Sequence, residues 1–145
     1  MHLWLQSGPH SYYTDGDLVF WRMVDVMEEV HIVSLLAAVE GVLARFRQGG
    51  LLVDCSQAHN IRAEARRRYA DWLKHSPYSD SHRASIFFAV DGEMRAFLTL
   101  AQRGAQLASG KRSAIEIVRD EAAARERVDE LRSEWAASDN AQAES

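Results

Sequence analysis

Residues Leu51-Leu52-Val53-Asp54-Cys55 form a short apolar run that becomes polar at its end. A continuous run of this kind predicts a strand that is buried on both faces of a parallel sheet. Residues 84–90 and 114–118 have the same character. Binding groups in open α/β sheets lie at the carboxyl ends of such strands, so the residues that follow Cys55 are the first candidates for function.

Segments with apolar residues at helical spacing separate these runs. The first begins after Asp25 and ends near Gly49. Three more helices are expected over residues 62–75, 94–108 and 120–137. Strands that alternate with helices of this length require right-handed crossovers and a largely parallel sheet covered by helices.

Two strands are expected before the first helix. Residues 2–6 and 18–24 are rich in Val, Leu, Phe and Trp, and turn residues such as Gly8 and Gly16 lie between them. We expect these two strands to pair as an antiparallel hairpin. The sequence therefore predicts an α/β fold of about five strands and four helices in the order ββαβαβαβα.

Composition narrows the class of protein. The chain has 145 residues, 47% of them hydrophobic and 26% charged, which is typical of one folded domain. A net charge of −4 disfavours binding to nucleic acid, and the single cysteine, Cys55, cannot form an internal disulfide. With no apolar run long enough to cross a bilayer and no signal peptide, we expect a cytoplasmic protein that is not inserted in a membrane.

The order of elements resembles the STAS fold, and in particular its SpoIIAA-like branch. Residues 51–56 (Leu-Leu-Val-Asp-Cys-Ser), the helix after them and residues 117–122 (Ile-Val-Arg-Asp-Glu-Ala) carry the resemblance. The resemblance implies one STAS-like domain over residues 1–137, followed by a polar, disordered tail at 138–145. It also implies a non-enzymatic bacterial interaction or regulatory module.

The chain departs from the family at the segment that carries the switch. In the signalling STAS proteins an Asp-Ser-Ser-Gly segment opens the helix and holds the phosphorylated serine. Asp54, Ser56 and Ile61 match the residues that lead to this segment, but Arg62-Ala63-Glu64-Ala65 stand in its place. Neither serine is present, so a kinase would find no hydroxyl group there.

The predicted partner surface is the loop and helix start at residues 56–68. Its partner is expected to be another protein or a second copy of this chain. Arginines on the same helix, with Lys74, His75 and Arg83 near them, form the strongest local charge bias, which could hold carboxylates or phosphates. The candidate partner-binding residues are Ser56, His59, Asn60, Arg62, Glu64 and Arg66.

An alternative function is that of a small-molecule or lipid carrier, because the same broad fold class resembles the lipid-binding SEC14-type domains. The groove would lie under the unusually apolar helix that contains Met94, Phe97 and Leu98. Ordinary core packing is the simpler interpretation of this stripe.

A third hypothesis is a hydrolase in which Cys55 or Ser56 acts as the nucleophile beside His59. The spacing matches no known hydrolase signature, and we predict no catalytic residue. The histidines lack metal-ligand spacing and no phosphate-binding loop is present, so we predict neither a metal site nor a cofactor.

Overall fold

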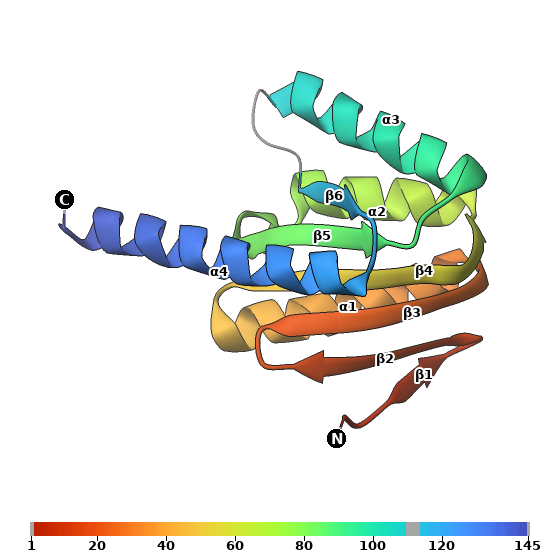
Figure 1. Ribbon diagram of the computed structural model, residues 1–145, viewed down its shortest axis with the longest axis horizontal. Coiled ribbons are helices and arrows are strands. Elements are labelled where there is room, and N and C mark those ends of the chain that lie inside the picture. Colours follow the sequence, from red (N-terminus) through yellow and green to blue (C-terminus); the bar gives the residue numbers. More distant parts are fainter. Residues whose placement is uncertain (1, 110–113, 145) are drawn as a thin grey trace.

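The computed structural model describes residues 2–109 and 114–144. It contains a six-stranded sheet in which the strands follow one another in chain order, with helices packed against it (Figure 1). The elements are β1 (Leu5–Ser7), β2 (His10–Asp15), β3 (Leu18–Met27), α1 (Glu29–Phe46), β4 (Gly49–Ile61), α2 (Ala63–His75), the 3-10 helix η1 (Ser79–Ser81), β5 (His82–Phe88), α3 (Gly92–Ser109), β6 (Ile115–Val118) and α4 (Glu121–Glu144).

The topology confirms the predicted α/β class. Strands β3 to β6 are parallel, and β1, β2 and β3 pair antiparallel. The sheet has one strand more than expected, because β2 lies between the two strands that were predicted to pair with each other. Gly8 and Gly16, with φ of +58° and +59°, form the turns on either side of β2, where a left-handed backbone favours glycine.

Strand β4 is much longer than the sequence indicated. Residues 56–60, expected as a loop, belong to this strand, which continues to pair with β3 as far as the Met27–Ile61 pair. Register shifts interrupt the pairing after Arg22 and after Asp25, and Asp25 has a φ of +60°. These irregularities change the direction in which the side chains point. Apolar and polar residues therefore do not alternate regularly in this part of the sequence.

Helices cover both faces of the sheet. Trp21, Met23 and Val53 belong to a core shared with α1, α2 and α3, whereas Phe20 and Leu52 belong to a second core shared with α4. The alternation of side chains along β3 and β4 therefore places neighbouring residues in opposite cores. We refer to these as the three-helix face and the α4 face.

Helix α4 extends to Glu144. The chain is thus helical over residues 138–144, where a disordered tail was expected, and Ser145 lies outside the described residues. The side chain of Asp139 accepts a hydrogen bond from Gln48, which ties this part of the helix to the start of β4.

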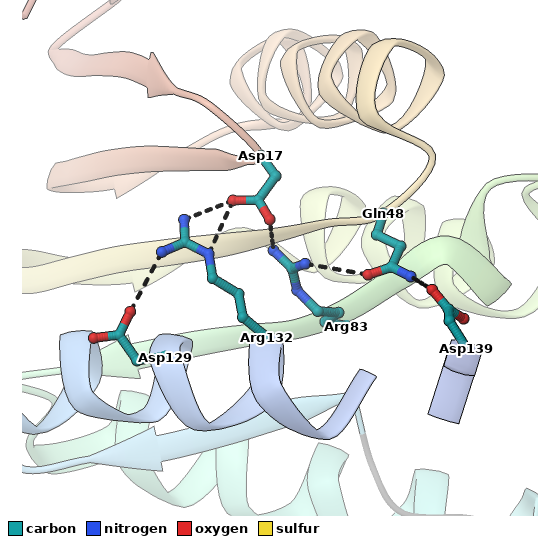
Figure 2. A network of polar contacts seen from close by, with 6 residues as sticks. All are labelled: Asp17, Gln48, Arg83, Asp129, Arg132 and Asp139. Atoms are coloured by element: carbon teal, nitrogen blue, oxygen red, sulfur yellow. Dashed lines mark hydrogen bonds and ion pairs between the residues drawn. The ribbon is translucent and has the colours of Figure 1, made fainter. Parts of the chain in front are cut away.

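A charged network closes the amino ends of the parallel strands (Figure 2). The side chain of Arg83, at the start of β5, is only 4% exposed, and its Nη2 lies 2.5 Å from Asp17 Oδ2. Arg132 of α4 donates to the other carboxylate oxygen at 2.6 Å. Burial raises the pKa of Asp17, but the hydrogen bonds from Arg132 and Arg83 outweigh it and hold the pKa below its usual range.

Replacing Asp17 with Asn leaves the buried Arg83 charge without its counter-ion. We expect the free energy of unfolding to fall by about 2–3 kcal/mol, measured by urea denaturation. The matched control is Asp129→Asn, because Asp129 pairs with Arg132 but its side chain is 78% exposed. The control should change stability by less than about 0.5 kcal/mol, and equal losses in the two variants would contradict a role for burial.

Candidate functional site

The carboxyl ends of β3 and β4 meet the first turns of α1 and α2. The backbone N–H of Arg62 donates to the carbonyl oxygen of Met27 at 2.9 Å, which joins the two strand ends. Arg68 of α2 and Glu29 of α1 form an ion pair at 3.3 Å. Both strand-to-helix connections therefore lie side by side at the edge of the sheet where α/β proteins bind their ligands.

Arg66 fixes the connection between β4 and α2. Its Nη2 donates to Asn60 Oδ1 and its Nε to the carbonyl oxygen of Ile61, both at 2.7 Å. The guanidinium lies 4.1 Å from the centroid of the Phe97 ring, within the range of a cation–π interaction. Asn60 and Arg66, both predicted to bind a partner, thus bind each other and hold the backbone in place.

The other four predicted partner-binding residues are exposed: Ser56, His59, Arg62 and Glu64. They lie along the end of β4 and the first turn of α2, and we call residues 56–68 the β4–α2 junction. Arg62 occupies the N-cap position of α2 with an extended backbone and makes no side-chain capping bond. The junction therefore presents hydroxyl, imidazole, guanidinium and carboxylate groups to solvent from a fixed backbone.

Three arginines of the basic surface expected on α2 pair with carboxylates. Arg67 lies 4.0 Å from Glu64, and Arg68 pairs with Glu29. Arg83 belongs to the network at the opposite end of the strands. Sequence proximity suggested one basic patch, but these three arginines pair with three different carboxylates.

A histidine pair that was not predicted from the sequence supports the start of α1. His10, on β2, is completely buried, and its Nε2 lies 3.3 Å from Nδ1 of His31. The backbone N–H of Val24 donates to His10 Nδ1 at 3.0 Å, and that of Glu28 donates to His31 Nδ1 at 3.1 Å. A Cβ atom on Gly8 would lie 2.3 Å from His31 Nε2, so glycine is required there.

These contacts define the protonation of His10. His10 Nδ1 accepts the backbone N–H of Val24 and therefore carries no proton, so the neutral His10 ring is protonated on Nε2. His10 then donates from Nε2 to His31. Burial, followed by the nearby His31, lowers the pKa of His10 to about 4, against a smaller opposing effect of a backbone hydrogen bond with Val26.

Cys55 does not have the properties of a nucleophile. Its side chain is buried, and its Sγ lies 4.0 Å from the carbonyl oxygen of Val53. Burial, with a smaller contribution from the charge of Asp54, raises the pKa of the thiol to about 12. The thiol stays protonated at neutral pH and out of reach of a substrate, which argues against the cysteine hydrolase.

Another serine and histidine, besides Ser56 and His59, lie together in the interior of the protein. Ser85 Oγ and His82 Nε2 are 2.8 Å apart, and both residues are buried beneath α2, where Trp72 packs edge-on against the imidazole. Burial, followed by the charge of Arg83, lowers the pKa of His82 to about 4. Without exposure to solvent, the pair serves packing rather than catalysis.

The proposed ligand groove under α3 is filled. Met94 and Leu98 are 5% and 1% exposed and belong to the core of the three-helix face, with Phe97 packed against it. The cavity beside Phe97 and Leu98 has a volume of about 20 Å³ and an apolar lining. This volume accommodates about one water molecule and is far below that of a ligand pocket.

Within residues 2–109 and 114–144, no three His, Cys, Asp or Glu residues are grouped closely enough to hold a metal ion. No helix in this part of the chain combines the length and the apolar character needed to cross a membrane.

Two solved structures have a similar fold. The first is the anti-sigma factor antagonist SpoIIAA in its unphosphorylated form, with a TM-score of 0.55 and 7% identity over 91% of this chain and 98% of that one. The second is an uncharacterised protein of the DUF3478 family from Shewanella loihica PV-4, described as having a SpoIIAA-like fold. Its TM-score is 0.50, with 16% identity over 90% of this chain and 92% of that one. No family model and no curated protein matches the sequence. The likenesses establish the predicted SpoIIAA-like fold.

Replacing Arg66 with Ala removes two hydrogen bonds and the contact with Phe97. We expect a loss of about 2 kcal/mol in the free energy of unfolding, together with faster amide hydrogen exchange at Ile61. Arg67→Ala is the control, because this neighbouring side chain is 74% exposed and should contribute less than about 0.5 kcal/mol. Similar effects in both variants would show that Arg66 does not fix the junction.

The His10 pair makes stability depend on pH. Because folding lowers the pKa of His10 from 6.5 to about 4, the unfolded chain binds the proton first as the pH falls. Its contribution is complete above pH 6.5 and is lost progressively towards pH 4, by about 2 kcal/mol. In His10→Asn, the difference in unfolding free energy between these two pH values should be smaller by that amount. An unchanged difference would show that His10 is not the group responsible. His82 contributes to the pH dependence of stability equally in both proteins, so its effect cancels in the comparison.

Proposed function

We propose that this protein is a non-enzymatic regulatory or interaction module of the STAS type, which binds a partner protein through the β4–α2 junction in the bacterial cytoplasm. The observation that carries the proposal is the Arg66 contact with Asn60 and Ile61. It holds the backbone beneath exposed polar side chains, so little conformational freedom is lost when a partner binds. The buried, reduced Cys55 agrees with a reducing compartment.

The same segment suggests how this module differs from a phosphorylation switch. Arg62 and Glu64 are exposed, whereas Ala65 is completely buried against the core. The first turn of α2 therefore offers charge but no hydroxyl group. We expect partner binding through this turn to be constitutive, with no phosphorylation at residues 62–65.

A carrier function is less well supported. Its pocket would have to open beneath α3, where the cavity measures about 20 Å³ and the side chains of Met94 and Leu98 are part of the core. A lipid or drug-sized molecule needs a volume more than ten times larger. Admitting one would require separation of α3 from the sheet.

Site-specific photocross-linking tests the partner surface. A photoreactive residue at His59 or Glu64, introduced into the full chain and exposed to extract from the cells that produce it, should give one discrete protein adduct. The control position is Glu126, which is exposed on α4. Arg62→Glu should reduce the adduct at position 59 at least about tenfold, which corresponds to about 1.4 kcal/mol.

Three outcomes would contradict the proposal. They are the absence of any adduct from both junction positions, an equal yield of the same adduct from position 126, and an adduct at position 59 that Arg62→Glu does not weaken. Because Arg62 is exposed at the N-cap, its substitution should leave the fold intact, which circular dichroism would verify.

A further inference from the structure

Strand β1 lies at one edge of the sheet, and β6 lies at the other. Strand β1 pairs with β2 on one side, through the Leu5–Tyr12, Gln6–Ser11 and Ser7–His10 pairs, and no strand of the described residues pairs with its other side. Figure 1 shows it at the rim of the sheet, beyond β2. Its outward backbone N–H and C=O groups are therefore available to another strand.

The residues of this edge are apolar and carry no charge of their own; the guanidinium of Arg22, which pairs with Asp54, lies 4.8 Å from the centroid of the Trp4 ring. Leu3, Trp4 and Leu5 are consecutive and are 80%, 41% and 45% exposed. Residues 3–9 contain no charged side chain. Natural proteins usually protect an edge strand with charges, proline or a bulge, but residues 3–7 carry none of these, and only the shortness of β1 limits pairing.

We propose that two copies of this chain associate through antiparallel pairing of β1 with β1, which joins their sheets into one. A twofold contact places the same surface against itself, so any charge on it would meet a like charge. The absence of charge over residues 3–9 removes that penalty. A second copy is thus electrostatically compatible with this edge, and its own apolar residues become covered in the same contact.

The side chains select a register centred on Leu5. In this register Leu5 faces Leu5 of the second copy, Trp4 lies opposite Gln6 and Leu3 opposite Ser7. Leu5 pairs with Tyr12 and so lies on the three-helix face, whereas Trp4 contacts Tyr13 and Phe20 on the α4 face. Opposite residues of antiparallel strands share a face, so the pairing covers apolar surface on both faces. A register centred on Gln6 would place two amides together and leave Leu5 opposite Ser7.

The proposed dimer contact does not involve the β4–α2 junction. Its test is therefore independent of the test of the proposed function. Analytical ultracentrifugation of the unmodified chain at micromolar concentration should show a dimer. Leu5→Lys places two charges opposite each other and should weaken dimerisation at least about tenfold. The control is Leu100→Lys, since Leu100 is 68% exposed on α3, and this variant should remain dimeric. The junction variant Arg62→Glu should also remain dimeric.

Cysteine cross-linking tests the register even if Leu5→Lys fails to fold. Leu5→Cys places two thiols directly opposite each other, within the reach of a disulfide, and mild oxidation should give a covalent dimer. In Leu3→Cys the two thiols are about 14 Å apart along the strands and should not react. The native Cys55 is buried and does not interfere.

A chain that stays monomeric at all concentrations would overturn the proposal and leave the edge to a strand of another protein. A dimer that Leu5→Lys does not weaken would also overturn it. Failure of Leu5→Cys to cross-link, or equal cross-linking of Leu3→Cys, would refute the register and with it this contact.

Discussion

The guanidinium of Arg83 is buried at the start of β5, and it can lie there only because Asp17 is 2.5 Å away. A buried charge without a partner costs several kcal/mol, so the segments that carry Arg83 and Asp17 must keep these two side chains together. Asp17 belongs to the turn between β2 and β3, and Arg132 brings α4 to the same carboxylate. The antiparallel strands, the parallel strands and the single helix of the α4 face are thereby joined at one end of the sheet. The opposite end is held by Arg66 and by the histidine pair.

The sequence predicted those parts of the fold whose signal lies within one element. The apolar runs at β4, β5 and β6 and the helical stripes between them required no knowledge of distant contacts. Strand β2 was missed because its residues, His-Ser-Tyr-Tyr-Thr-Asp, are mostly polar and lie between two turns. Its burial depends on pairs made elsewhere: Tyr13 stacks on Phe20, and His10 binds His31 across the sheet–helix boundary. The second half of β4 was missed because the irregular pairing with β3 disrupts alternation.

The exposure of several candidate residues could be predicted from the sequence, but their contacts could not. Polarity after a buried strand correctly indicated exposed side chains such as His59 and Glu64. Nothing local distinguishes Arg66, which is bonded to Asn60, from Arg67, which faces solvent one residue later on the same helix. That difference arises from the position of Phe97 on α3, a tertiary contact. For the same reason Arg83, close in sequence to the arginines of α2, lies at the other end of the strands.

Ala63 and Glu64 stand where the STAS segment has its two serines, and both are exposed on the first turn of α2. Neither side chain carries a hydroxyl group, so this turn offers no acceptor for a phosphate. Ala65, at the position of the family's glycine, packs against the core with no exposed surface. The exposed positions on this turn already carry fixed charges of both signs. On the function proposed above, the charges of Arg62 and Glu64 would supply the binding chemistry of the junction without modification of its first turn.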